Sequence, residues 1–401
     1  MNNCSEYVGS GHPDKVADLV ASYLLDAYIK HDPKTRFALE VLLKDHICNL
    51  AGEVTSTWRP TDDEIAELAR EAIRKVGYTA EYAARWPVGA TLNADKVMVN
   101  NYIGRQSPDI AQGVDREGWG DQGIMEGMAT HEAEYGYMPR DRHFAHEIGK
   151  KLYRAALRGD APIGLDIKVL VSLNPAAVDQ VVIAAPMLPE NETSANTYIE
   201  RIVRETLSEH NYKMCDELII NGTGAYVIHS SVGDAGVVGR KLAVDFYGLN
   251  CPIGGGSPNG KDGTKADVTL NLYARYLSLL TVLKNPGKFR TVYTKIGCCI
   301  GQSKCRIAQF DGNHRLLTEH QRDIIPSSAI RLFGLDGRVR KDMFFHMCRD
   351  GLFSYVDEVA AQNNGIVPYG EKGRRGSDPC DTVDVIRSMS ACGQGRRLSV
   401  E

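Results

Sequence analysis

The sequence predicts a mixed α/β fold of the α+β kind, in which a sheet with packed helices recurs about three times. Two observations support this prediction. Segments with helical periodicity and segments with strand-like alternation follow one another in three sets along the chain. The chain also has 401 residues, a length that favours two or three domains over one.

The first set begins with a helix. Pro13 suits a first helical position, and apolar residues recur every three or four positions until the chain reaches Pro33. Alternating apolar residues then predict strands over 37–43 and 47–56, joined by a turn at 44–46. The two strands are therefore expected to form a hairpin directly after the helix.

The hairpin places two carboxylates on one face. If the turn centres near residues 45–46, Glu40 and Glu53 point to the same side of the sheet. Thr61 and Glu64 then form a capping box that opens a second helix, and Gly77 is its expected end. The first set is thus predicted to form a helix, a hairpin and a second helix.

The second and third sets repeat this mixture without repeating its sequence. Helices are predicted near 142–158, 195–209 and 267–282, and strands near 164–173, 179–185, 217–229 and 290–299. Two long stretches, 104–123 and 248–265, lack periodicity, and loops of this length are usually lids or binding loops. Residues 362–381 and the tail after 388 are polar and small, so disorder is expected there.

Bulk composition excludes several classes of protein. The formal net charge is −4, so no global field would attract nucleic acid or a membrane surface. No apolar run approaches 18 residues, and the first residues lack the pattern of a signal peptide, so a cytoplasmic enzyme is expected. The ten cysteines form no Cys-x-x-Cys pair, which argues against a zinc site.

The segment 11–15, Gly-His-Pro-Asp-Lys, stands at the start of the first predicted helix. His12, Asp14 and Lys15 are thereby placed where backbone N–H groups and the helix dipole favour an anion. Asp14 would repel a bare phosphate but could ligate a magnesium ion that bridges to phosphate oxygens. Ordinary capping of the helix remains the alternative interpretation.

The segment 254–262 nearly satisfies a P-loop pattern. Asp262 stands where that motif needs a hydroxyl for magnesium, and no strand-to-helix context is evident, so a P-loop is rejected. Its glycines still allow close approach of the backbone to phosphate, and Lys261 and Lys265 supply charge. A flexible solvated loop would look the same.

Two further groups of charged residues could bind a nucleotide. Asp234 precedes Arg240 and Lys241 in a glycine-spaced segment, so an acid for hydroxyl or ammonium groups lies near cations for phosphate. Asp166 and Lys168 are two positions apart on a predicted strand and therefore face one side. A turn and an amphipathic edge strand, respectively, are the alternatives.

Taken in order, these segments resemble the S-adenosylmethionine synthetase family, also called methionine adenosyltransferases. No single motif is decisive, but their order across residues 5–300 is very specific. The matching segments are 5–6, 11–15, 52–55, 106–110, 120–123, 233–241, and 254–256 with 260–262.

The resemblance implies an enzyme in which methionine sulfur attacks the 5′ carbon of ATP. The whole triphosphate leaves and is then hydrolysed to phosphate and pyrophosphate. The implied fold has three similar domains about a pseudo-threefold axis, discontinuous in sequence, with active sites shared between the subunits of a dimer or tetramer. The implied units are 1–10 with 124–230 (N-terminal), 11–103 with 231–266 (central), 104–123 (gating loop) and 267–401 (C-terminal).

The resemblance also implies a role for each matching residue. The leaving phosphates and the reacting groups would be held by His12, Lys15, Lys168, Arg240, Lys241, Lys261 and Lys265. The nucleotide would be contacted by Glu6, Asp166, Tyr226, Asp234 and Ser257, and methionine by Glu53, Gln106, Asp234, Lys265 and Ile296. The gating loop would use Gln106, Asp109, Asp115, Trp119 and Asp121, while Asp14 and Asp267 would bind Mg²⁺, two ions per site, and Glu40 would bind K⁺.

Some residues depart from the family pattern. Ser10 and Ala225 stand where the family usually has Glu and Arg, Val268 stands where Arg is usual, and Trp119 interrupts the gating loop. The resemblance fades beyond about residue 305. A weakly catalytic paralogue that binds ATP or regulates an active subunit is therefore the alternative hypothesis. An ATP-using enzyme that acts on another thioether is a third hypothesis. The partners expected on the main reading are ATP, L-methionine and further copies of the chain.

Overall fold

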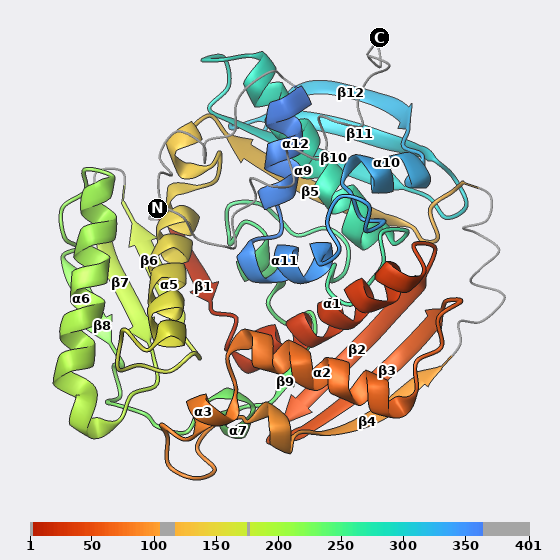
Figure 1. The fold of residues 1–401 in the computed structure, drawn as a ribbon. Helices are drawn as coiled ribbons and strands as arrows, with labels where there is room; N and C mark the ends of the chain where they lie inside the picture. The colour runs from red at the N-terminus through yellow and green to blue at the C-terminus, as the bar shows by residue number, and fades with distance from the viewer. Residues whose placement is uncertain (1–2, 105–116, 175–176, 364–401) are drawn as a thin grey trace.

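The described residues form three four-stranded sheets, each with helices packed against it. A computed structural model describes residues 3–104, 117–174 and 177–363. Figure 1 shows the three sheets around a shared centre in which helix α1 lies. The expected α/β class with three domains is confirmed. The disorder expected after residue 363 and most of the expected gating loop lie outside the described residues.

The first sheet has the strand order β4-β3-β2-β9. Its strands are β2 (Arg36–Lys44), β3 (Ile47–Thr55), β4 (Met98–Gly104) and β9 (Gly236–Val237), and its helices are α1 (Pro13–His31) and α2 (Asp62–Val76). The hairpin register pairs Ala38 with Glu53 and Glu40 with Ala51, which confirms the expected shared face. The capping box of Thr61 and Glu64 and the left-handed Gly77 are also confirmed.

The second sheet has the order β1-β6-β7-β8 and joins the N-terminal strand to the middle of the chain. Its strands are β1 (Asn3–Val8), β6 (Lys168–Leu173), β7 (Val178–Ala184) and β8 (Glu217–Ile220), covered by α5 (Arg140–Arg158) and α6 (Glu192–Glu209). The predicted strand over 217–229 is wrong beyond Ile220. The chain turns there, because Asn221 adopts a positive φ and its carbonyl accepts the N–H of Gly224.

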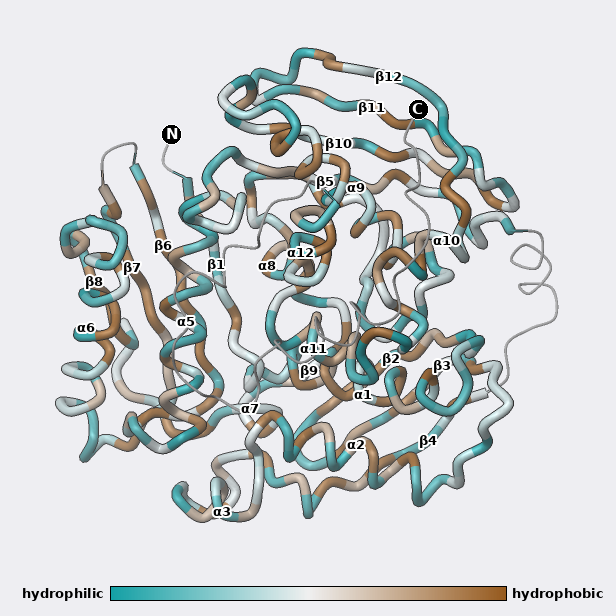
Figure 2. Tube along the Cα trace, turned by 45° about the horizontal axis from the view of Figure 1, so that its top comes forward, coloured by the Kyte–Doolittle hydropathy of each residue, from teal (hydrophilic) through white to brown (hydrophobic). Residues whose placement is uncertain are grey.

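The third sheet has the order β12-β11-β10-β5. Its elements are β5 (Gly123–Thr130), β10 (Thr291–Cys298), β11 (Lys304–Asp311), β12 (Leu316–Asp323) and the helices α9 (Ala266–Lys284) and α12 (Ser354–Asn363). Figure 2 shows that the edge strand β12 is mostly hydrophilic, as suits a strand whose outer edge is unpaired.

Strand β5 corrects one expected boundary. Residues 124–130 were grouped with residues 1–10, but β5 pairs along its length with β10. The physical reason is close packing on α9: a Cβ at Gly127 would lie 2.3 Å from the backbone carbon of Ala274. Only a glycine lets this strand approach that helix, so β5 belongs with the C-terminal elements.

Shorter helices lie between these elements. They are α3 (Ala80–Ala83), α7 (Ser230–Gly233), α8 (Leu242–Asp245), α10 (Pro326–Leu332), α11 (Met343–Asp350), η1 (Ala94–Lys96), η2 (Ala133–Tyr135) and η3 (Pro189–Asn191). Arg275, which is fully buried, binds Asp357 and so ties α12 to α9. Asp26 of α1 accepts the N–H groups of Phe344 and Phe345 and so caps α11. None of the helices described here has the length and apolarity needed to span a bilayer.

Candidate active site

The N-terminus of α1 fixes the orientation of His12. His12 is the N-cap, and its Nδ1 accepts the backbone N–H of Asp14 at 3.1 Å. Burial first, and then the nearby cations Lys168 and Lys241, lower the pKa of His12 to about 3, although Asp14 opposes this shift. The ring is therefore neutral at pH 7. Because Nδ1 accepts, the ring proton sits on Nε2, which is left as a hydrogen-bond donor.

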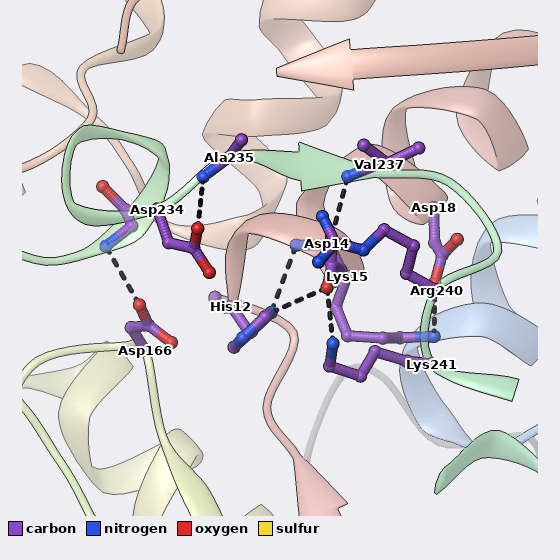
Figure 3. Close-up of polar contacts among 12 residues, drawn as sticks. His12, Asp14, Lys15, Asp18, Asp166, Asp234, Ala235, Val237, Arg240 and Lys241 are labelled. Carbon is purple, nitrogen blue, oxygen red and sulfur yellow. Dashed lines mark hydrogen bonds and ion pairs between the residues drawn. The ribbon is translucent and has the colours of Figure 1, made fainter. Parts of the chain in front are cut away.

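Asp14 joins two segments that lie far apart in the sequence. Its Oδ1 accepts the N–H of Val237 at 2.8 Å, its Oδ2 accepts from Lys241 Nζ at 2.5 Å, and Arg240 lies 3.7 Å away. Burial raises the pKa of Asp14, but the bonds to Lys241 and Val237 outweigh burial and the pKa is lowered overall. Figure 3 shows His12 between this cationic group and a second acidic group. Arg240 and Lys241 thus pack beside the 11–15 motif within one chain.

Lys15 is buried at the start of α1 and paired within the chain. Its side chain is 3% exposed and its Nζ lies 3.0 Å from Asp18 and 2.8 Å from Asp245. A lysine in the first helical turn on the inward face is directed to the core, and the buried carboxylate of Asp18 and the partly exposed one of Asp245 hold it there. In this structure Lys15 is an internal ion-pair residue, and its contact with phosphate stays a prediction.

Asp166 and Tyr226 form the acidic side of the site. The carboxylate Oδ2 of Asp166 accepts the N–H of Ser230 at 3.0 Å, and its carbonyl accepts the hydroxyl of Tyr226 at 3.1 Å. Burial raises the pKa of Asp166 to about 6, against the opposing effects of the Ser230 N–H and Lys168. Asp166 precedes strand β6 rather than lying on it, and Lys168 is the first residue of that strand. A buried, destabilised carboxylate here is typical of a functional site.

Replacing Asp166 with Asn should stabilise the folded chain. The folded pKa is raised, so ionisation of Asp166 opposes folding. The free-energy cost of this ionisation is absent below the unfolded pKa and grows between about pH 4 and 6. Above pH 6 it stays at about 2–3 kcal/mol. Urea unfolding of Asp166→Asn and of the wild type at pH 7.5 and pH 5 measures it. The gain should shrink at pH 5, and a loss of stability at pH 7.5 would contradict the assignment.

A second charged group lies at the N-terminus of α9. Lys261 Nζ binds Asp267 Oδ2 at 2.6 Å, and the other oxygen of Asp267 accepts the N–H of Gly256 at 2.7 Å. Lys265 is the N-cap residue of α9. Ser257 accepts the N–H of Asn259, which shapes the preceding loop. Phosphate-binding residue types therefore gather here as the sequence predicts.

The two charged groups lie along the same edge of β2. Gly236 pairs with Leu43, and Lys261 forms a bridge with Ala38. Leu43 and Ala38 are five positions apart, which corresponds to about 16 Å of strand. The group around Asp14 and the group around Asp267 are therefore neighbours but not in contact through β2.

The remaining predicted residues are distributed around these groups. Glu40 and Glu53 are exposed on the open face of the first sheet, beside the charged groups. Glu6 lies on β1, two positions before the residue that pairs with Lys168. Ile296 is fully buried within β10. Asp234 accepts the N–H of Ala235 and faces the side of Asp166 in Figure 3.

The described end of the predicted gating loop is anchored in the third sheet. Trp119 is fully buried, and its backbone carbonyl accepts the N–H of Gly301 at 2.7 Å. Its backbone N–H donates to the carbonyl of Gln302. Asp121 is exposed and its carbonyl contacts Cys298. Trp119 therefore acts as an anchor for the loop. Gln106, Asp109 and Asp115 lie outside the described residues.

Sequence reasoning missed the residues that support this site. Asp18 and Asp245 neutralise Lys15, and only the i, i+3 spacing of Asp18 offered a signal in the sequence. His229 and Tyr82 lie fully inside the protein near Asp166. No motif or spacing pointed to them, because they are 147 positions apart in the chain.

Family models match the chain over most of its length. Three family models of S-adenosylmethionine synthetase match the chain: the N-terminal domain over residues 1–108, the central domain over 116–226 and the C-terminal domain over 228–314. The matched regions contain every charged residue of both groups. The helices α10 to α12 lie beyond them.

Relatives and a solved structure extend the agreement. S-adenosylmethionine synthase of Wolinella succinogenes is 39% identical over 288 residues, which is 68% of this chain and 71% of the relative. The enzyme of that name from Sulfurovum sp. strain NBC37-1 is 38% identical over 292 residues, 68% and 72% of the two chains. A solved structure described as an unusual S-adenosylmethionine synthetase from Campylobacter jejuni superposes with a TM-score of 0.77 at 26% identity, covering 90% of this chain and 97% of that one. On this agreement of sequence and fold, the chain belongs to the S-adenosylmethionine synthetase family.

Proposed function

We propose that the chain makes S-adenosylmethionine from ATP and L-methionine, by attack of the methionine sulfur on the 5′ carbon of ATP. The observation that supports this most strongly is the arrangement at the N-terminus of α1. A neutral His12 with its donor on Nε2 lies beside Lys241 and Arg240, and the helix dipole adds further positive potential. These groups suit a leaving triphosphate, on which negative charge develops as the carbon–oxygen bond breaks.

No strong general base is needed for this first step. A neutral thioether becomes a sulfonium cation, so the chain's work is to align sulfur, carbon and leaving oxygen and to stabilise the departing charge. Lys241, Arg240, Lys261 and Lys265 would hold phosphate oxygens, and Lys168 with Asp166 would hold the nucleotide. Tyr226 would lie against the adenine ring. Hydrolysis of the triphosphate would follow at the same groups.

Asp14 and Asp267 would hold Mg²⁺. Both side chains offer carboxylate oxygens, which magnesium prefers, and each is neutralised here by a lysine, Lys241 or Lys261. Among the described residues no three acidic, histidine or cysteine side chains gather around one point, so substrate phosphates and water would complete the coordination. A bound ion would neutralise polyphosphate oxygens and free both lysines to contact phosphate. We propose K⁺ near Glu40 on the adjoining sheet face.

Two chains would assemble through the open face of the first sheet. This face carries the apolar side chains of Leu42, Ile47, Met98 and Tyr102, which are 45%, 40%, 54% and 67% exposed, although the other face is covered by α1 and α2. Exposed apolar surface of this kind marks an interface. Glu53 lies on the same face, so a second chain would complete the methionine site there. A cytoplasmic location is part of the same proposal.

The replacement Tyr102→Glu should convert the dimer to a monomer and abolish activity. A charge placed in an apolar interface would have to be desolvated on association. Sedimentation velocity measures the assembly, and S-adenosylmethionine formation measures activity. Val88→Glu is the matched control, since Val88 is 99% exposed and lies between α3 and η1, outside the strands of the first sheet. A Tyr102→Glu dimer with normal turnover would contradict the interface.

The function itself is tested with the purified chain, ATP, methionine, Mg²⁺ and K⁺. Liquid chromatography should detect S-adenosylmethionine, and omission of either Mg²⁺ or methionine should abolish it. Parallel reactions with other thioethers, such as ethionine, measure the selectivity for methionine. Binding of ATP without product across all metals and thioethers would overturn the proposal and favour a regulatory paralogue.

A further inference from the structure

A buried polar network lies behind Asp166 and belongs to neither charged group. Tyr82 and His229 are 3% and 1% exposed, and the Tyr82 hydroxyl lies 2.8 Å from His229 Nε2. His229 Nδ1 lies 2.7 Å from the carbonyl of Val227, and the N–H of Leu165 donates to the Tyr82 oxygen at 3.1 Å. The indole of Trp86 packs edge-on against the imidazole at 4.5 Å. Every member is thus held in one place.

The direction of each hydrogen bond follows from the atoms available. The carbonyl of Val227 can only accept, so Nδ1 of His229 carries the ring proton. Burial lowers the pKa of His229 to about 4, so the ring is neutral at pH 7 and Nε2 presents a lone pair. Tyr82 must therefore donate to His229, which leaves the phenol oxygen free to accept the N–H of Leu165. One arrangement satisfies the donors of Tyr82, His229 and Leu165.

This network ends on the residue before Asp166. Asp166 is then held at its carbonyl by Tyr226 and at its carboxylate by the N–H of Ser230. Ser230 follows His229 directly and adopts φ = 60°, a conformation that costs a residue with a side chain about 1 kcal/mol or more. Its hydroxyl accepts the N–H of Leu92, which holds that conformation in place. His229 therefore acts on Asp166 in two ways, through Tyr82 and Leu165 and through the next residue, Ser230.

We infer that His229 and Tyr82 are positioning residues that set the place of Asp166 in the nucleotide site. The inference rests on the proposed function, because it takes Asp166 as a nucleotide contact. Neither side chain is placed to touch substrate. Their effect should be larger on ATP binding than on methionine binding, because both ends of the network act on Asp166, whereas Asp234 is reached only through the carbonyl of Ser230, which accepts its N–H.

Two substitutions of His229 separate the hydrogen bonds. A Gln amide oxygen can reach the position of Nε2 and still accept from Tyr82, whereas an Asn amide nitrogen reaches only the position of Nδ1 and loses that acceptor. His229→Gln should therefore keep the KM for ATP within about twofold, whereas His229→Asn and Tyr82→Phe should raise it about tenfold, as expected for one lost buried hydrogen bond. The kcat and the KM for methionine should stay within about twofold.

The control is Tyr276→Phe, which removes another buried phenol hydroxyl, one that accepts from Asn363 far from Asp166. Steady-state kinetics with varied ATP and varied methionine, together with the melting temperature of each variant, provide the readout. Equal kinetics in wild type, His229→Asn and Tyr82→Phe would overturn the positioning role, as would equal rises of both KM values. A wild-type chain without turnover would overturn the proposed function and, with it, this inference.

Discussion

Lys241→Met should lower kcat/KM for ATP by about 10² to 10³. This is the effect expected when a positive charge aligned with a developing oxyanion is removed. Lys241 is 18% exposed, binds Asp14 at 2.5 Å and helps to keep His12 neutral. Its loss removes a phosphate contact and leaves the negative charge of Asp14 with less positive charge beside it. Both effects should appear mainly in kcat, because the charge on the triphosphate is greatest as it leaves.

The control for this variant is Lys75→Met. Lys75 is a half-exposed helical lysine 3.9 Å from Glu71, an i, i+4 pair of little energetic value. Its replacement should leave kinetics and stability unchanged within error. Initial rates of S-adenosylmethionine formation and urea unfolding are measured for both variants. Normal turnover by a folded Lys241→Met protein would contradict its place in the site.

Lys15→Met should destabilise the fold by about 3–5 kcal/mol, the cost of breaking a buried ion pair from one side. Burial alone would lower the pKa of Lys15, but the carboxylates of Asp18 and Asp245 raise it well above its usual value. Removal of the ammonium leaves both carboxylates without their cation. A sharp drop in the urea midpoint is therefore expected, whereas a phosphate contact would lose activity at unchanged stability.

A double variant separates the two roles of Lys15. Lys15→Met combined with Asp245→Asn removes one cation and one anion together, so most of the lost stability should return. Guanidinium unfolding of the two single variants and the double variant measures their coupling. A stable but inactive Lys15→Met protein would contradict the internal ion pair and restore Lys15 as a leaving-group contact.

Local chemistry made much of the first sheet and its helices predictable. Pro13, the Thr61–Glu64 capping box and Gly77 act through neighbouring backbone, and the β2–β3 register follows from a short turn. The pairing of β5 with β10 depends instead on packing between segments more than 160 positions apart. Such a contact leaves no periodic signal, so the expected boundary at residue 124 was wrong.

The site was predictable in its residue types and less so in its geometry. His12, Asp14 and Lys241 carry the chemistry that phosphate needs, and the structure brings them together. Lys15 has the same residue type as Lys241 but points inward, because its helical position and the carboxylate of Asp245 decide its direction. A residue's charge alone cannot distinguish a ligand from a core ion pair.

In the proposed reaction the whole triphosphate leaves ATP when methionine attacks its 5′ carbon. ³¹P nuclear magnetic resonance of a reaction with purified chain, ATP, methionine, Mg²⁺ and K⁺ measures the phosphorus products directly. We expect pyrophosphate and orthophosphate in equal amounts, each matching the S-adenosylmethionine formed, and neither product without methionine. Formation of ADP or AMP in place of these products, or unchanged ATP in the complete mixture, would contradict it.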